Sequence, residues 1–240
     1  IARTQQAGLT LTPKQLFQAP TIAQLACIAS MSHAPRIHAE QGRVTGEAPL
    51  TPIQHWFFEQ DLVEPQHWNQ AVMLQVHQPL RRVSLEQALA GVLAHHDALR
   101  THFTRDELGW HATNVVDGQV PLAWIDLRAE SAPACVIETR AAELQASLNL
   151  AEGPLLRAAY FDLGAERAGR LLLIAHHLVV DGVSWRILLD DLLTAYQQTC
   201  QGERVELPAK TTSFQYWARR LQTYAQSEQV RQEWTYWHDA

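Results

Sequence analysis

Two adjacent histidines, His176 and His177, end an apolar run and precede an Asp-Gly pair in the stretch IAHHLVVDGVSW, residues 174–185. An imidazole with an unperturbed pKa of about 6.5 can take or give a proton near neutral pH. Ligands commonly bind at the ends of strands in α/β folds, and Gly182 removes a side chain where a substrate could approach closely. The stretch therefore predicts general acid/base chemistry by histidine.

The geometry of a strand argues against a metal ion held by both histidines. Residues 170–175, RLLLIA, form a short, nearly continuous apolar run, which is typical of a central strand buried on both faces. If this strand continues through His177, the two imidazoles point to opposite faces and cannot bind one ion. We therefore expect no metal here, while a structural role for both histidines stays open.

A second His-His-Asp sequence, His95-His96-Asp97, offers an internal comparison. It ends a stretch with apolar residues at helical spacing, and a cationic imidazole at a helix C-terminus complements the helix dipole without any catalytic role. We expect no direct chemistry from this second site. The sequence also lacks the G-x-S-x-G, G-x-G-x-x-G and H-E-x-x-H signatures of other common sites.

The elements that must position these residues mix strands with helices. Alternating or continuous apolar residues predict strands at 69–77, 155–162 and 170–175, with a polar turn at 164–169. Capping residues or helical periodicity predict helices that begin near Thr12, Thr21, Thr51 and Ser184, and further helices at 85–93, 134–148 and 211–224. This mixture predicts an α/β fold.

Composition narrows the class of protein. The chain has 240 residues, 47% of them hydrophobic, and a formal net charge of -6. The acidic balance and the lack of a Lys/Arg cluster argue against nucleic acid as a partner. No apolar run is long enough to cross a bilayer, so we expect no membrane partner and a cytoplasmic location. We expect Cys27, Cys135 and Cys200 to be reduced, buried thiols, because their spacing suits neither a disulfide framework nor a zinc site.

The distribution of apolar residues divides the chain into three parts. Residues 1–30 carry two short predicted helices, which cannot form a stable domain alone. Residues 31–48 are polar and without periodicity, so they predict a linker. The denser pattern of residues 49–240 predicts a folded domain. Because the chain does not begin with Met, we expect it to be part of a longer protein.

Four stretches together resemble one protein family. HHLVVDG at 176–182 matches the HHxxxDG motif of the modular nonribosomal peptide synthetases, and three stretches resemble their epimerization domain: LTPIQHWFFE at 50–59, VDGVSWRILLDDL at 180–192 and PAKTTSFQYWA at 208–218. The related condensation domain usually has an Arg shortly after the Gln of the first motif and a Trp directly after HHxxxDG. This chain has Gln54-His55-Trp56 and Val183-Ser184-Trp185 there, so the resemblance favours epimerization.

The resemblance implies an architecture. It implies that residues 49–240 are the N-terminal lobe of an epimerization or condensation-type domain, similar to chloramphenicol acetyltransferase, with a mixed sheet and flanking helices. The C-terminal lobe would be missing from this chain. Residues 1–30 resemble the C-terminal helices of a peptidyl carrier domain, whose 4'-phosphopantetheine arm would be attached to a serine outside this chain. The implied partners are the carrier domain with its thioester substrate, the missing lobe and a downstream condensation domain.

The implied reaction is the inversion, from L to D, of the Cα of an aminoacyl or peptidyl thioester on that arm. His177 is implied as the base or acid and His176 as a structural residue, with Gly182, Ser184 and Trp185 as supporting motif residues. The second lobe is implied to supply a glutamate as the other half of the acid/base pair. This chain alone should then be inactive as an isomerase.

A structural role is implied for Arg100, in HHDALRTHF at 95–103. The resemblance places Arg100 to form a bidentate ion pair with Asp181, which would hold the motif loop. Two alternatives to epimerization stay open. One is a condensation domain that joins two carrier-bound substrates with the same histidine, and the other is a docking or structural role without catalysis.

Overall fold

The computed structural model describes residues 4, 9–31, 39–118 and 122–239. The chain divides into two compact units, Ile1–His38 and Ala39–Ala240, and each is described by itself. The linker predicted at 31–48 is therefore wrong in its second part, because residues 39–48 belong to the second unit. Residues 32–38 of that prediction lie outside the described residues.

Residues 9–31 of the first unit form two short helices beside a pair of two-residue strands. The helices are α2 (Pro13–Gln18) and α3 (Ile22–Ile28), and β1 (Leu9–Thr10) pairs antiparallel with β2 (Ser30–Met31). Each helix begins at a threonine whose side chain and backbone exchange hydrogen bonds with a glutamine three residues later. The helix starts predicted at Thr12 and Thr21 are confirmed, since such caps depend only on neighbours in the sequence.

The second unit is built on a four-stranded mixed sheet. Its strands are β4 (Asn69–Val76), β9 (Gly169–His176), β8 (Leu156–Asp162) and β7 (Leu122–Asp126), in that order. Strand β9 pairs antiparallel with both β4 and β8, and β7 pairs parallel with β8. The central strand predicted from RLLLIA is confirmed, because β9 lies between two strands and residues 171–176 are buried.

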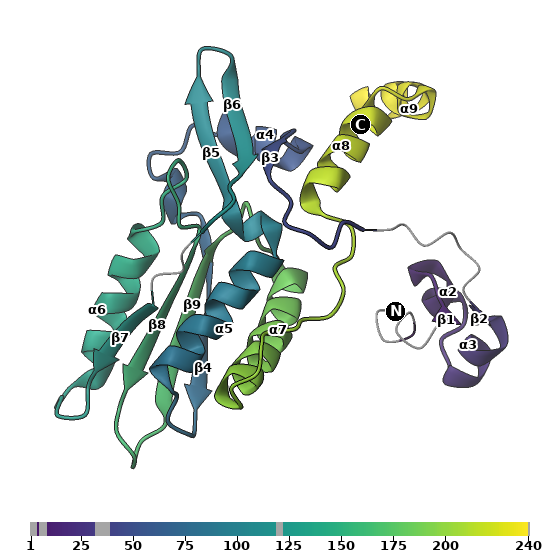
Figure 1. The fold of residues 1–240 in the computed structure, drawn as a ribbon. Helices are drawn as coiled ribbons and strands as arrows, with labels where there is room; N and C mark the ends of the chain where they lie inside the picture. Colours follow the sequence, from purple (N-terminus) through teal and green to yellow (C-terminus); the bar gives the residue numbers. More distant parts are fainter. Residues whose placement is uncertain (1–3, 5–8, 32–38, 119–121, 240) are drawn as a thin grey trace. The chain divides into compact units, whose positions relative to one another are not determined.

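Helices cover both faces of this sheet (Figure 1). The helices α5 (Arg82–His95) and α7 (Gly182–Cys200) lie on one face, and α6 (Pro133–Ala146) lies on the other. Side chains alternate along β9, so this strand contributes to the core on each face of the sheet. Leu171 and Leu173 join the core under α5 and α7, whereas Leu172 and Ile174 join the core under α6. This layered arrangement confirms the mixed α/β fold.

A second, smaller sheet extends from the first. It contains β3 (Gly46–Ala48), β6 (Gly109–Asn114) and β5 (Thr101–Asp106), all antiparallel and in that order. The short 3-10 helix η2 (Asp97–Arg100) joins α5 to β5, and α4 (Pro52–Glu59) follows β3. The helix predicted to start at Thr51 is confirmed, because the Gln54 side chain accepts a hydrogen bond from the Thr51 backbone N–H at 2.9 Å.

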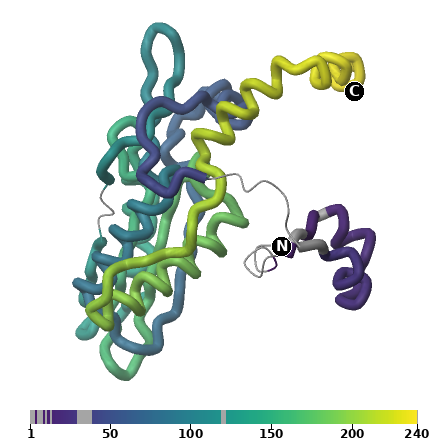
Figure 2. Tube along the Cα trace, turned by 45° about the vertical axis from the view of Figure 1, so that its right-hand side comes forward, coloured from purple at the N-terminus to yellow at the C-terminus, as the bar shows by residue number. Residues whose placement is uncertain are grey.

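Two helices end the chain, α8 (Phe214–Ala225) and α9 (Glu228–His238). The buried Gln215 ties α8 to the segment before α4, since its Nε2 donates to the Glu47 carbonyl at 2.9 Å, and Figure 2 shows these segments side by side. Both helices carry exposed aromatic side chains, with Trp217 at 52% and Trp234 at 69% of their maximum exposure.

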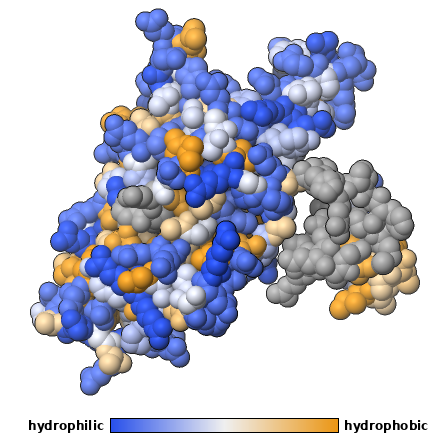
Figure 3. Space-filling model, in the orientation of Figure 1, coloured by the Kyte–Doolittle hydropathy of each residue, from blue (hydrophilic) through white to orange (hydrophobic). Residues whose placement is uncertain are grey.

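Two further expectations concern the burial of the cysteines and the presence of membrane-spanning helices. All three cysteines are free thiols, but Cys27 and Cys135 are exposed and Cys200 is half-buried, so the prediction of buried thiols is wrong. None of the described helices is long and apolar enough to span a membrane. On the face shown in Figure 3, apolar residues form small, separate groups among polar ones.

Candidate functional site

His176 is the last residue of β9, and its side chain is fully buried. Its Nδ1 accepts a hydrogen bond from the Leu178 backbone N–H at 3.1 Å, so the ring proton lies on Nε2 and is donated to the Pro65 carbonyl at 2.8 Å. Pro65 belongs to the 3-10 helix η1 (Pro65–His67). Burial lowers the pKa of His176, which keeps the imidazole neutral. These contacts give His176 a structural role.

His177 is exposed and lies in the turn that follows β9. Its backbone N–H donates to the Trp68 carbonyl at 2.9 Å, which holds the turn against the start of β4. The two histidines do separate, as predicted, into one buried and one exposed residue. The strand ends at His176, however, so the turn rather than strand alternation directs the His177 side chain.

Hydrogen bonds determine which nitrogen of His177 is basic. The Trp185 indole N–H can only donate, and it donates to Gln70 Oε1 at 2.9 Å, so the Gln70 amide nitrogen must face the imidazole. That nitrogen donates to His177 Nε2 at 3.2 Å, and His177 Nδ1–H donates to the Val180 carbonyl at 2.8 Å. His177 Nε2 therefore carries the lone pair that can accept a proton.

A cavity of about 480 Å³ opens beside His177. Three of the predicted motif stretches contribute to its wall: Gln54 and Phe57 come from 50–59, Asp181 from 180–192, and Phe214 from 208–218. The wall is mainly apolar, with a few polar groups, which is typical of sites that bind small organic groups. The tertiary fold thus brings residues more than 150 positions apart in the sequence to one place.

Asp181 caps helix α7. Its Oδ1 accepts hydrogen bonds from both the backbone N–H and the hydroxyl of Ser184, each at 2.7 Å. These bonds lower the pKa of Asp181 and keep it ionised. The expectation that Ser184 caps the helix is wrong, because the helix begins at Gly182 and Ser184 lies in its first turn. Gly182 lacks a positive φ and has open space around it, so the structure shows no backbone need for glycine there.

The implied ion pair between Arg100 and Asp181 is wrong. Arg100 is only 2% exposed, and its Nη2 donates to Asp97 Oδ1 at 2.9 Å. Its Nη1 donates to the carbonyls of Leu93 and Ala94, at 2.7 and 2.9 Å, which are free because α5 ends there. Arg100 therefore stabilises the end of its own helix and the turn after it, while Asp181 stays at the exposed start of α7.

In the second His-His-Asp sequence, the structure departs from the expected cationic imidazole at a helix C-terminus. Burial and the neighbouring His96 lower the pKa of His95, so the expected cationic imidazole at this helix end is wrong for His95. His96 Nε2 lies 2.7 Å from Asp191 Oδ2, which belongs to α7. Asp97 pairs with Arg100 and, at 3.3 Å, with Lys210.

Gln70 is the site residue that the sequence analysis missed. It lies on β4, opposite Ala175 of β9, and reaches both Trp185 and His177. A polar side chain near the start of a predicted strand was the available signal. Its significance depends on the pairing of two strands about 100 residues apart, which local periodicity does not report.

Comparisons with known proteins agree on one family. Residues 44–240 match the family described as Condensation domain. One of the linear gramicidin synthase proteins of Brevibacillus parabrevis is 52% identical over 240 residues, which are 99% of this chain and 5% of that protein. The crystal structure of the epimerization domain from the third module of tyrocidine synthetase B is similar with a TM-score of 0.80 and 38% identity, over 86% of this chain and 45% of that chain.

A condensation domain shares the fold at lower similarity. The first condensation domain of the calcium-dependent antibiotic synthetase matches with a TM-score of 0.68 and 24% identity, over 80% of this chain and 46% of that chain. The chain therefore spans about half of each solved domain and a small part of the gramicidin synthase protein.

Proposed function

Because the chain belongs to the condensation-domain family of nonribosomal peptide synthetases, we propose that it is part of an epimerization domain of this family. The domain would invert, from L to D, the Cα of an aminoacyl or peptidyl group held as a thioester on a carrier domain. The observation that carries this proposal is the convergence of three motif stretches on one cavity beside His177. The family and the fold implied by the sequence are confirmed by the comparisons.

His177 Nε2 is the proposed base. It would take the Cα proton, and the electron pair of the broken C–H bond would move into the thioester carbonyl as an enolate. The imidazolium formed in this step is stabilised by its Nδ1–H, which already donates to the Val180 carbonyl. Returning a proton to the opposite face needs a second group on the other side of the substrate. We propose that the second lobe supplies it, as a glutamate in the family pattern.

Delivery of the substrate is a further part of the proposal. The substrate would arrive on the 4'-phosphopantetheine arm of a carrier domain, attached to a serine outside this chain. The mainly apolar wall of the cavity, with Trp56, Phe57 and Trp68, suits the uncharged acyl thioester better than a charged ligand. We also propose that residues 1–30 are the C-terminal helices of that carrier domain and that a downstream condensation domain receives the product.

Condensation is the second candidate, because the family match carries that name. The two reactions use the same histidine and differ in product. The 38% identity to an epimerization domain, against 24% to a condensation domain, supports the isomerase. The contact between Trp185 and Gln70 supports it as well, since the resemblance associates a Trp at this position with epimerization.

The test follows deuterium in a two-lobed protein supplied with an L-aminoacyl carrier domain in D₂O. An epimerase incorporates deuterium at Cα and yields the D residue, whereas a condensation domain yields a longer peptide on the acceptor carrier. We expect His177→Ala to lower the exchange rate by about 100-fold or more, because it removes the base. His77→Ala is the matched control, since His77 is exposed and follows the end of β4 that is distant from the site. Equal exchange in both variants, or an amide product, contradicts the proposal.

A further inference from the structure

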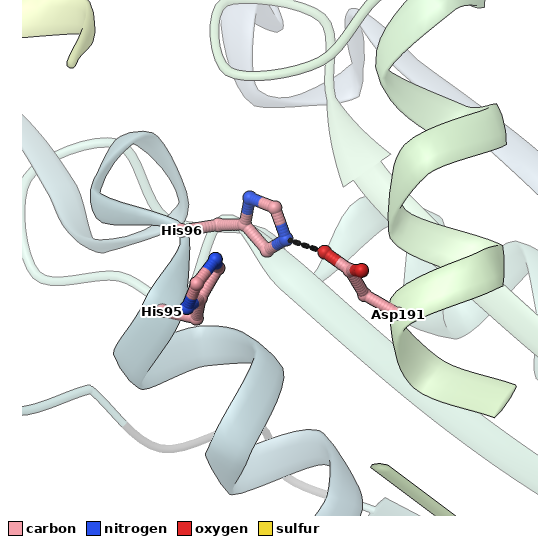
Figure 4. A group of neighbouring side chains, drawn as sticks. All are labelled: His95, His96 and Asp191. Atoms are coloured by element: carbon pink, nitrogen blue, oxygen red, sulfur yellow. Dashed lines mark hydrogen bonds and ion pairs between the residues drawn. The ribbon is translucent and has the colours of Figure 1, made fainter. Parts of the chain in front are cut away.

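We infer that His95, His96 and Asp191 form a binding site for a divalent transition metal ion such as Zn²⁺. One ligand atom of each side chain lies within 4.8 Å of the others. Figure 4 shows both imidazoles at the end of α5 and the carboxylate approaching from the neighbouring helix α7. This site is separate from the proposed catalytic histidine and does not depend on the proposed function.

The backbone explains why two consecutive histidines can converge here. Helix α5 ends at His95, and His96 has extended φ and ψ angles of -92° and 97°. This change of conformation brings the two rings to a centroid separation of 5.0 Å. At His176 and His177 the same residue pair is separated instead, because one ring is buried and the other is exposed.

The packing of α5 against α7 holds the third ligand in place. Leu89 and Val92 of α5 lie in the same buried cluster as Leu188 and Leu192 of α7. Asp191, next to Leu192, is only 7% exposed and points to the end of α5. The three ligands thus lie on two rigid, packed elements, which favours a preformed site.

The existing contacts leave ligand atoms without partners. Asp191 forms one side-chain hydrogen bond or ion pair, through Oδ2 with His96, among the described residues. His95 forms a ring contact with His96 but no side-chain hydrogen bond in that part of the chain. A structural ion pair accounts for His96 and Asp191, but it does not explain why a half-buried imidazole without a partner lies beside them.

The donor set selects the class of ion. Two imidazole nitrogens and one carboxylate oxygen suit Zn²⁺, Co²⁺, Ni²⁺ or Cu²⁺ rather than Ca²⁺ or Mg²⁺, and three protein ligands leave a fourth position for water. The Lys210 ammonium acts on His95 electrostatically and lies 3.3 Å from the Asp97 carboxylate, which it shares with Arg100. A bound ion would join α5 to α7.

The experiment titrates Zn²⁺ into the metal-free chain by calorimetry and Co²⁺ by visible absorption. We expect a site with a stoichiometry of one, and at least a tenfold weaker affinity at that site in His95→Gln and Asp191→Asn. The His95 variant should keep the fold, because the His95 side chain makes no hydrogen bond to the residues that the structure describes. Its circular dichroism and thermal midpoint without metal check this point.

The matched control is His111→Ala, which disrupts the exposed His111–Asp106 pair on the hairpin of β5 and β6. This variant should bind like the unchanged chain, and saturating Zn²⁺ should raise the thermal midpoint of both. Absence of stoichiometric binding, or equal affinity in the unchanged chain and His95→Gln, overturns the inference and leaves His96 and Asp191 as an ion pair only.

Discussion

At the scale of single residues, the chemistry of the site depends on the protonation pattern of His177. Trp185 orients the Gln70 amide, and Gln70 in turn faces the imidazole Nε2 with a donor. Position 183 is 72% exposed, so a Trp directly after Gly182 would not occupy the place of Trp185 against Gln70. The Trp of the Ser-Trp sequence therefore contacts the proposed base, His177, through the Gln70 amide.

This link predicts the effect of Gln70→Glu. A carboxylate in place of the amide would lie beside His177 Nε2 and favour the charged imidazolium over the neutral base. A smaller fraction of His177 is then the neutral base at neutral pH, so a higher pH should be required to reach the same rate of Cα exchange. Imidazole NMR titration and the pH dependence of Cα exchange measure both effects. Gln75→Glu, at an exposed position of β4, should change neither, and an unshifted His177 in Gln70→Glu would refute the contact.

At the scale of elements, the motif loop is held by helix caps rather than by an ion pair across the site. Asp181 caps the start of α7, and Arg100 binds the carbonyls at the end of α5. Each side chain stabilises the terminus of the helix beside it, where backbone groups lack partners. The start of α7 and the end of α5 are thus stabilised independently of each other.

This arrangement predicts additive effects of two substitutions. Asp181→Ala should lower the free energy of unfolding by about 1 kcal/mol, because it removes an N-cap. Arg100→Ala should cost more, since it removes the donor to the carbonyls at the end of α5 and one of the cationic partners of the buried Asp97. The double variant should equal the sum of the two within about 0.5 kcal/mol, as for residues without a direct contact. Urea unfolding measures the free energies of unfolding of all three variants. A strong coupling energy between the two substitutions would indicate that Arg100 and Asp181 do interact.

At the scale of the whole molecule, the chain holds one wall of a proposed two-sided site. It covers 45% of the similar epimerization domain, and the aromatic residues of its last two helices are largely exposed. Inversion needs proton removal on one face of the Cα and proton return on the other. His177 can serve only one of these faces, so we propose that the other belongs to the second lobe.

The 240-residue chain should therefore convert no L-aminoacyl carrier to the D form, whereas a protein that adds the second lobe should do so. Chiral analysis of the amino acid released from the carrier measures the conversion. Circular dichroism of the chain alone is the control that separates a missing catalytic group from a failure to fold. Conversion by the folded chain at the rate of the two-lobed protein would show that the second lobe is not needed.

Local patterns predicted the features that depend on near neighbours in the sequence. The Thr12, Thr21 and Thr51 helix starts are determined by a glutamine three residues later. The nearly continuous apolar run at 170–175 predicted a central strand, because a strand covered on both faces needs apolar residues at successive positions. The motif residues themselves also identified the family without any coordinates.

The sequence by itself thus determined three strands of the main sheet, most of the helices and the family, and the tertiary structure decided the partners of the side chains. Gln70 and Asp191 form contacts set by how helices and strands pack, and the sequence analysis missed them. Arg100 was misassigned, because its ion-pair partner is Asp97, three residues before it, rather than Asp181. The physical reason is range: caps and periodicity act over three or four residues, whereas the site depends on contacts between segments about 100 residues apart.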